Sequence, residues 1–168
     1  MADQHAIANI VASVLQHLQQ LGAREQQPVP VALSTPAGIA GNGGLAICLW
    51  QVIPASRNAS LPELSPSGVL VRPRAMFDLR FLGASAAGEA VRQSEQLSWL
   101  LWALSSYPVV RNEAPLPAVT LVFDQLDQAA DLAVRTALGL LVPIVSFTAR
   151  SATMELGTGG PTGPVLAP

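Results

Sequence analysis

The stretch "LAICLWQVI", residues 45–53, limits most strictly how this chain can fold. It is almost without polar side chains, it follows a glycine-rich turn sequence and it ends at Pro54, which predicts a short buried β-strand. A strand that is apolar on both faces must be covered on both faces. We therefore expect helices against one face, and the chain's own second layer or a neighbouring copy against the other. Trp50 on this strand is accordingly a candidate interface residue.

Two long helices are predicted on either side of this strand in the sequence. The first begins near Asp3, as its N-terminal cap, and ends at Gly22. Its apolar residues recur at spacings of three and four: Ile7, Ile10, Val11, Val14, Leu15, Leu18 and Leu21. The second begins near Glu89 and ends at Tyr107-Pro108. Its predicted apolar face consists of Val91, Ser94, Leu97, Leu101 and Leu104, with Trp99 and Trp102 on neighbouring faces.

The remaining pattern predicts further strands, separated by loops. Residues 75–82 alternate between apolar and mixed positions, which is typical of a strand with one buried face. Shorter strands are expected at 31–33, 119–123 and within "LLVPIVSFTARSA", where Pro143 indicates an edge position or an irregular start. Three further segments are expected to be loops or turns: 34–44, 55–68 and 83–88. A short helix is expected over residues 124–138.

Together these elements predict an α+β fold with a mostly antiparallel sheet of four to five strands. Two longer helices and one short helix would pack on that sheet. At 168 residues the chain is long enough for one domain with a proper core, which we expect over residues 1–153. Residues 154–168 are dominated by Gly, Pro and Thr and are expected to form a flexible tail.

The surface is predicted to be short of charge. Half of the residues are hydrophobic and only 12% are charged, which indicates surface hidden against other copies or partners, or else a compositional bias. All nine basic residues are arginine, which fits both interpretations. A net charge of −2 without a basic run argues against nucleic acid as the main ligand. No apolar stretch reaches the roughly 20 residues that a membrane span needs, and the amino terminus lacks a secretory signal pattern.

The residues of this sequence offer little support for a catalytic function. His5 and His17 lie twelve residues apart on one helix, too far to share a metal. The aspartates at 124, 127 and 131 could hold a divalent cation, although a solvated helix start explains them equally. "GIAGNGG" precedes a strand, whereas a dinucleotide-binding loop must follow one. Cys48 lies in the apolar strand and is expected to be a buried thiol. We therefore expect no enzyme, no cofactor and no metal site.

The order of these parts resembles a known family. An amino-terminal helix beginning "MADQHAIANI", the strand "LAICLWQVI" with a following loop, and the strand "MFDLRFL" recur there in the same order. So do a helix ending in "LSSYPVV", the step "VTLVFDQLDQAADL" and a last strand, here "PIVSFTARS". Over about residues 2–151 the chain is similar to the amino-terminal domain of cap, or tail-terminator, proteins of phage-tail-like extracellular contractile injection systems. It departs in its short Ala-rich third helix, and the further carboxy-terminal domain of many relatives is missing.

The resemblance implies a non-enzymatic particle component. Such proteins form a homohexameric ring on the baseplate-distal end of the inner tube, where they stop the growth of tube and sheath. The implied partners are other copies, the inner tube protein and the sheath protein, without nucleic acid or membrane. The implied location is the bacterial cytoplasm during assembly and then the released or intracellular particle. An assembly chaperone and a small-molecule-binding or catalytic α+β module remain alternatives, the latter using the half-buried face of "MFDLRFL".

Five residues are candidates for contacts with these partners. Arg57 and Asn58 lie in an exposed-looking, proline-flanked loop, and arginine suits forked hydrogen bonds to carboxylates or backbone carbonyls. We expect them to contact a neighbouring subunit or the rim of the tube. Arg80, Arg111 and Trp50 complete the set of expected interface residues.

Overall fold

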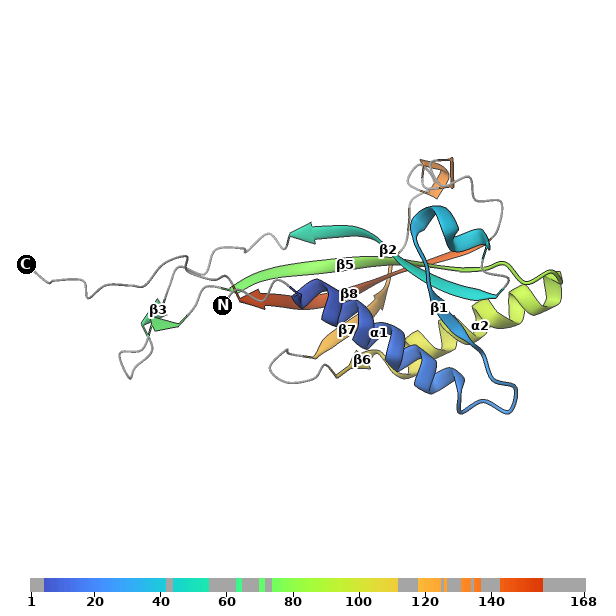
Figure 1. Ribbon diagram of the computed structural model, residues 1–168, viewed down its shortest axis with the longest axis horizontal. Coiled ribbons are helices and arrows are strands. Elements are labelled where there is room, and N and C mark those ends of the chain that lie inside the picture. Colours follow the sequence, from blue (N-terminus) through green and yellow to red (C-terminus); the bar gives the residue numbers. More distant parts are fainter. Residues whose placement is uncertain are drawn as a thin grey trace, which may run out of the picture.

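A computed structural model describes residues 5–41, 44–54, 63–64, 70–71, 74–111, 118–124, 126, 131–133, 135–136 and 143–155. Two α-helices, one 3-10 helix (η1) and eight strands have both of their ends within these ranges, and residues 131–133 and 135–136 are helical as well (Figure 1). In chain order they are α1 (Ala6–Gly22), β1 (Val31–Leu33), η1 (Pro36–Gly41), β2 (Leu45–Pro54), β3 (Glu63–Leu64), β4 (Leu70–Val71), β5 (Arg74–Ser85), α2 (Ala90–Ser106), β6 (Val109–Val110), β7 (Val119–Phe123) and β8 (Ile144–Glu155).

Six of the strands form one mixed sheet in the order β1-β2-β5-β8-β7-β6. All neighbours are antiparallel except β1 and β2, which run parallel. The α+β class and the mostly antiparallel pairing are thus confirmed. The sheet has more strands than expected, because two-residue β6 is too short to leave a sequence pattern. The pair β3–β4 forms a second, two-stranded sheet, and β3 falls in a segment that was expected to be a loop.

Both α-helices cover the same face of the six-stranded sheet (Figure 1). The stripe predicted for α1 is confirmed, because Ile10, Val14, Leu18 and Leu21 are all buried there. They belong to a core that includes the rings of two neighbouring strands, Phe81 of β5 and Phe147 of β8. These rings stack with their centroids 5.2 Å apart and their planes 9° from parallel.

The face of α2 that packs differs from the predicted one. Val91 is 70% exposed and Leu101 is 43% exposed, whereas Leu100, Ala103, Leu104 and Gln96 are buried. Gln96 can be buried because its Oε1 accepts a hydrogen bond of 2.6 Å from Ser85 Oγ. A buried polar residue of this kind is invisible to a hydrophobic pattern, so the predicted face of α2 was wrong by part of a turn.

The turn predicted at residues 83–88 was wrong for residues 83–85, because β5 continues to Ser85, while residues 86–88 do connect β5 to α2. Gly83 lies within the strand for a packing reason. A Cβ atom built on Gly83 would come within 2.5 Å of Leu100 Cδ2, so the glycine makes room for α2 on the sheet. Gly83, one of the small residues that suggested a turn, therefore lies where α2 packs on the sheet.

The opposite face of β2 is covered by the chain itself. Ala46 and Cys48 pack with Ile39 of η1 and with Leu82 and Ala84 of β5, and all five side chains are buried. Trp50, Leu126 and Ile144 adjoin this second cluster. Leu45 and Ile47 on the other face of β2 join the core beneath the helices. The expected coverage of this strand on both faces is confirmed for residues 45–48.

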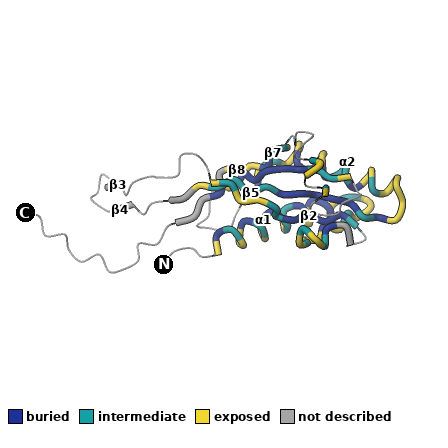
Figure 2. The backbone as a smooth tube through the Cα atoms, turned by 90° about the horizontal axis from the view of Figure 1, so that it is seen from above, coloured by how far each residue is buried: buried dark blue, intermediate teal, exposed yellow. Residues whose placement is uncertain are grey.

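Burial decreases along β2 beyond this point. The residues from Gln51 to Pro54 are exposed or half-buried, and Figure 2 shows buried residues concentrated in the middle of the sheet. The segment predicted as loop at 34–44 contains η1, whose Ile39 is fully buried. That loop prediction was therefore wrong for residues 36–41.

Four smaller predictions concern where helices and strands begin and end. α1 is assigned from Ala6, and its predicted cap Asp3 lies outside the described residues. Asp124 follows β7 without being helical, so the short helix does not begin there; residues 131–133 and 135–136 are helical. Pro143 precedes an internal strand rather than occupying an edge. β8 reaches Glu155, and the boundary between domain and tail stays a prediction because 156–168 lie outside the described residues.

Candidate functional site

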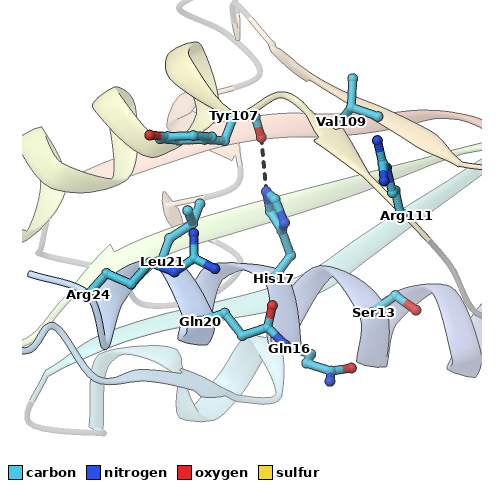
Figure 3. Close-up of a pocket in the computed structure, with 9 residues that line it drawn as sticks. All are labelled: Ser13, Gln16, His17, Gln20, Leu21, Arg24, Tyr107, Val109 and Arg111. Carbon is cyan, nitrogen blue, oxygen red and sulfur yellow. Dashed lines mark hydrogen bonds between the residues drawn. The ribbon is translucent and has the colours of Figure 1, made fainter.

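A hollow lies between α1 and the segment that joins α2 to β6. It is an open pocket of about 600 Å³ (Figure 3). We call it the arginine pocket. Its lining residues are Ser13, Gln16, His17, Gln20, Leu21, Arg24, Tyr107, Val109 and Arg111.

His17 joins the two walls of the arginine pocket. Its Nε2 lies 3.0 Å from the carbonyl oxygen of Tyr107. A carbonyl oxygen can only accept, so His17 Nε2 carries the hydrogen and donates it. His17 is half-buried, and this contact joins α1 to the end of α2.

The lining of the arginine pocket is polar and cationic. Figure 3 shows Arg24 and Arg111 on either side of His17. No carboxylate is among the lining residues, and no ion pair to either arginine is found in the described part of the chain. The pocket therefore offers two guanidinium groups, with their rigid fork of donors, to an anionic group from outside.

An exposed aromatic surface adjoins the arginine pocket. Trp102 and Tyr107 meet edge to face with ring centroids 5.6 Å apart, and each residue is 45% exposed. Val109 follows on β6 and is 52% exposed. Tyr107 and Val109 also line the pocket, so the two features form one continuous surface. We call Trp102, Tyr107 and Val109 the aromatic rim.

Trp50 and Arg80 lie together on the sheet face away from the helices. Trp50 occupies an irregularity in the β2–β5 pairing, which shifts register between Leu49 and Gln51. The side chain is half-buried against the second cluster, and its indole nitrogen finds no acceptor in the described part of the chain. Arg80 NH1 donates to Gln51 Oε1 at 3.2 Å. The interface role of both residues stays a prediction.

Arg80 is also engaged by an acidic partner inside the chain. Its Nε lies 2.9 Å from Asp124 Oδ2, and Thr148 Oγ1 donates to the same carboxylate oxygen. These contacts connect β5, β8 and the end of β7 on one face. Of the three aspartates considered as ligands of a divalent cation, Asp124 thus pairs with an arginine. Asp131 also pairs with an arginine, Arg135, at 2.7 Å. Asp127 lies outside the described residues.

The other predicted interface residues are distributed differently. Arg57 and Asn58 lie outside the described residues. Arg111 lies in the arginine pocket on the helix side of the sheet, so it is not grouped with Trp50 and Arg80. Sequence reasoning missed the pocket and the rim, although Trp102, which lies on a different face of its helix from the buried residues, is the signal that could have indicated them.

Cys48 is buried in the second cluster. Burial raises the pKa of its thiol to about 11, against a smaller lowering effect from a hydrogen bond to the backbone of Leu82. The thiol is therefore protonated and unreactive at neutral pH. Within the described ranges, no group of three or more metal-ligating side chains is found. The helices in these ranges are too short or too polar to cross a bilayer.

Comparison with solved structures shows where this fold occurs. The chain is similar to the sheath/tube terminator of PVC, an extracellular contractile injection system, in its extended state, with a TM-score of 0.64 and 13% identity. It is also similar to the tube-terminating cap of the anti-feeding prophage, with a TM-score of 0.66 and 11% identity. Each match covers 94% of this chain, which spans 61% and 58% of the two solved chains.

The fold that the sequence resemblance implied is thereby confirmed, since both similar structures are caps of contractile injection systems. No protein-family model and no curated protein matches the sequence. At this level of identity the likeness concerns the fold.

Proposed function

We propose that this chain is a cap that ends the growth of the inner tube and the sheath of a phage-tail-like contractile injection particle. One observation carries the proposal: 94% of the chain superposes on two proteins described as a sheath/tube terminator and a tube-terminating cap. A shared fold alone does not fix a function. The surface of this chain supplies a second argument, because it carries exposed aromatic and arginine residues suited to protein contacts.

The proposed assembly is a homohexameric ring at the baseplate-distal end of the tube. Subunits of a ring contact each other through two different surfaces, and the contacts close by rotation. A contact of standard size, about 1,600 Å² in total, is sufficient for each pair. The low charge content and the exposed apolar side chains of this chain agree with burial of such surfaces in an assembly.

The proposed role is structural rather than enzymatic. The two similar structures are caps, and the described residues include no group of three or more metal-ligating side chains. The histidine of the arginine pocket is committed to a backbone carbonyl. This arrangement supports a role in which the chain binds proteins and performs no covalent chemistry.

The proposed partners are the inner tube protein and the sheath protein. Arg57 and Asn58, together with Trp50 and Arg80, are the proposed contacts with a neighbouring copy or the tube rim. The chain would assemble in the bacterial cytoplasm and remain part of the finished particle.

The test is to produce the particle with and without this chain and to measure the lengths of tube and sheath by electron microscopy. Particles with the chain should have one length and extra density at the end away from the baseplate. Particles without it should have a broad length distribution, because nothing stops polymerisation. Unchanged lengths and unchanged ends would contradict the proposal.

Two further measurements separate the alternatives. An assembly chaperone would be absent from purified particles when their proteins are identified by mass spectrometry, whereas a cap would be present. A small-molecule-binding module would be a monomer by light scattering and would gain thermal stability from metabolites. A cap should form a ring and show no such gain.

A further inference from the structure

The exposed apolar side chains of this chain are not evenly spread. Large apolar residues with at least 38% exposure occur at scattered positions on several elements, but Leu101, Trp102, Tyr107 and Val109 fall within nine consecutive residues. Their clustering indicates a surface that is covered in the working state of the protein.

The composition of this surface is that of a binding hot spot. The aromatic rim supplies a tryptophan and a tyrosine held edge to face, and the adjoining arginine pocket supplies Arg24 and Arg111. Tryptophan, tyrosine and arginine are the residues most enriched where truncation costs binding energy. The ring contact fixes the orientation of both aromatic side chains, so little rotamer freedom is lost on binding.

The charges of the surface specify what it can bind. Two guanidinium groups lie around a pocket with no carboxylate in its lining. The complementary segment must therefore present a carboxylate, and it must also present an apolar side chain to the aromatic rim.

The same chain carries such a segment at the start of α2. Glu89 is exposed, and its side chain has no partner in the described part of the chain. Two residues further on, Val91 is 70% exposed, more than any other large apolar residue of the described ranges. We call residues 88–91 the α2 tip. In Figure 1 it lies at the right-hand end of the molecule, where β5 turns into α2.

We infer that the α2 tip of one copy docks on the arginine pocket and aromatic rim of the next copy. In this contact Glu89 faces Arg111 and Arg24, and Val91 covers the aromatic rim. The two surfaces lie at different places on the molecule, so the contact is head-to-tail and propagates from copy to copy. The inference adds detail to the proposed ring function. It rests on that proposal, because the ring is the reason for choosing a second copy of the chain as the binding partner.

A charge exchange tests the contact. Arg111→Glu and Glu89→Arg each place like charges opposite one another, and each should weaken self-association at least about tenfold. The probe is the purified full chain, and the measurement is its mass by light scattering over a range of concentrations. Arg150→Glu is the matched control, because Arg150 is exposed on β8 outside the pocket and should leave the mass unchanged.

Mixing the two variants gives the decisive result. In an equimolar mixture the two variants can alternate along the assembly. The altered pocket of one variant then meets the altered tip of the other, the unaltered pocket meets the unaltered tip, and every contact again joins opposite charges. The mixture should therefore recover the assembly that each variant alone has lost, and the double variant should recover it within a single chain. Recovery cannot result from misfolded variants, so it also serves as the folding control.

The other outcomes overturn the inference. A wild-type chain that stays a monomer at all concentrations, or single variants that assemble like the wild type, would exclude this contact. Mixed variants that stay monomeric would exclude it as well. The tube-length measurement is independent of these results. Excluding this contact would therefore leave the proposed cap function standing, and excluding the cap function would leave the proposed contact standing.

Discussion

Helix α1 ends at a residue whose lack of a side chain is a packing requirement. A Cβ atom on Gly22 would lie 2.2 Å from the carbonyl oxygen of Val29, which is closer than nonbonded atoms can approach. The same two residues are joined by a hydrogen bond of 3.1 Å from Val29 N to Gly22 O. The chain that leads from α1 to β1 therefore folds back directly onto the end of the helix.

Gly22→Ala should destabilise the protein by about 1–3 kcal/mol, because the clash is with backbone and no rotamer change relieves it. Urea denaturation measures the loss. Gly88→Ala is the control, since a Cβ atom there meets nothing within 4 Å, and it should change the free energy of unfolding by less than about 0.5 kcal/mol. Equal stability of the two variants would contradict this account of the helix end.

The buried thiol of Cys48 makes stability depend on pH in the alkaline range. Its pKa is about 11 in the folded chain and near 9.0 when solvated, so folding favours the protonated form. Stability should be unaffected by this group below about pH 9. It should fall as pH rises from 9 to 11, because the unfolded chain loses the proton first.

The expected loss by pH 11 is about 2–3 kcal/mol, at about 1.4 kcal/mol for each unit of the pKa difference. Urea denaturation at pH 8 and at pH 10.5 measures it. Cys48→Ala should be less stable at pH 8 but should lose less on going to pH 10.5. A variant with the same pH dependence as the wild type would show that other groups cause the loss.

At the scale of elements, η1 is a structural layer rather than a surface connection. Its Ile39 is fully buried over Ala46 and Cys48 of β2. Ile39→Ala should cost about 2–4 kcal/mol of unfolding free energy, because it leaves a cavity on the strand face that no α-helix covers. Leu33→Ala provides the comparison in calorimetry: Leu33 is 47% exposed, and its loss should lower the melting temperature far less. A similar effect of both substitutions would mean that η1 does not seal the sheet.

The elements that the sequence predicted well are those whose apolar residues recur at regular spacing without a buried polar residue among them. The stripe of α1 and the alternation of β5 identified Leu18 and Phe81 as core residues. α2 was placed correctly along the chain but turned wrongly, because buried Gln96 interrupts its apolar face while Val91 lies in solvent. η1 was missed since Gly, Pro and Ala normally indicate a loop, and its coverage of β2 depends on the tertiary fold.

At the scale of the whole molecule, the sheet was predicted more completely than the candidate site. Arg111 was identified, but nothing in the sequence relates it to His17 and Tyr107, which the fold brings together over about 90 residues of chain. The pairing of Arg80 with Asp124 is equally non-local. Hydrophobic periodicity reports which face of an element is buried, and it does not report which polar residues of different elements meet.

The carboxy-terminal segment can be tested by truncation. Deleting residues 156–168 should leave the folded domain intact, because β8 and its pairing with β5 end at Glu155. The sequence of this segment predicts a flexible arm, and about 13 residues of flexible chain would span roughly 20 Å and reach a partner's sheet edge, so the deletion should weaken retention on sheathed particles. The measurement is cap occupancy on full and truncated particles after a salt wash. Equal occupancy would assign the segment no binding role.

The position of β8 has a consequence for how the chain reaches its fold. The last described strand lies inside the sheet, where it pairs residue 144 with residue 84 and residue 155 with residue 74. Closing such long loops is slow, so this is a high contact-order topology. During synthesis, the edges of β5 and β7 that pair with β8 stay open until β8 has left the ribosome. The nascent protein is therefore most prone to aggregation just before β8 inserts, and a chain truncated before β8 lacks the strand that joins β5 to β7.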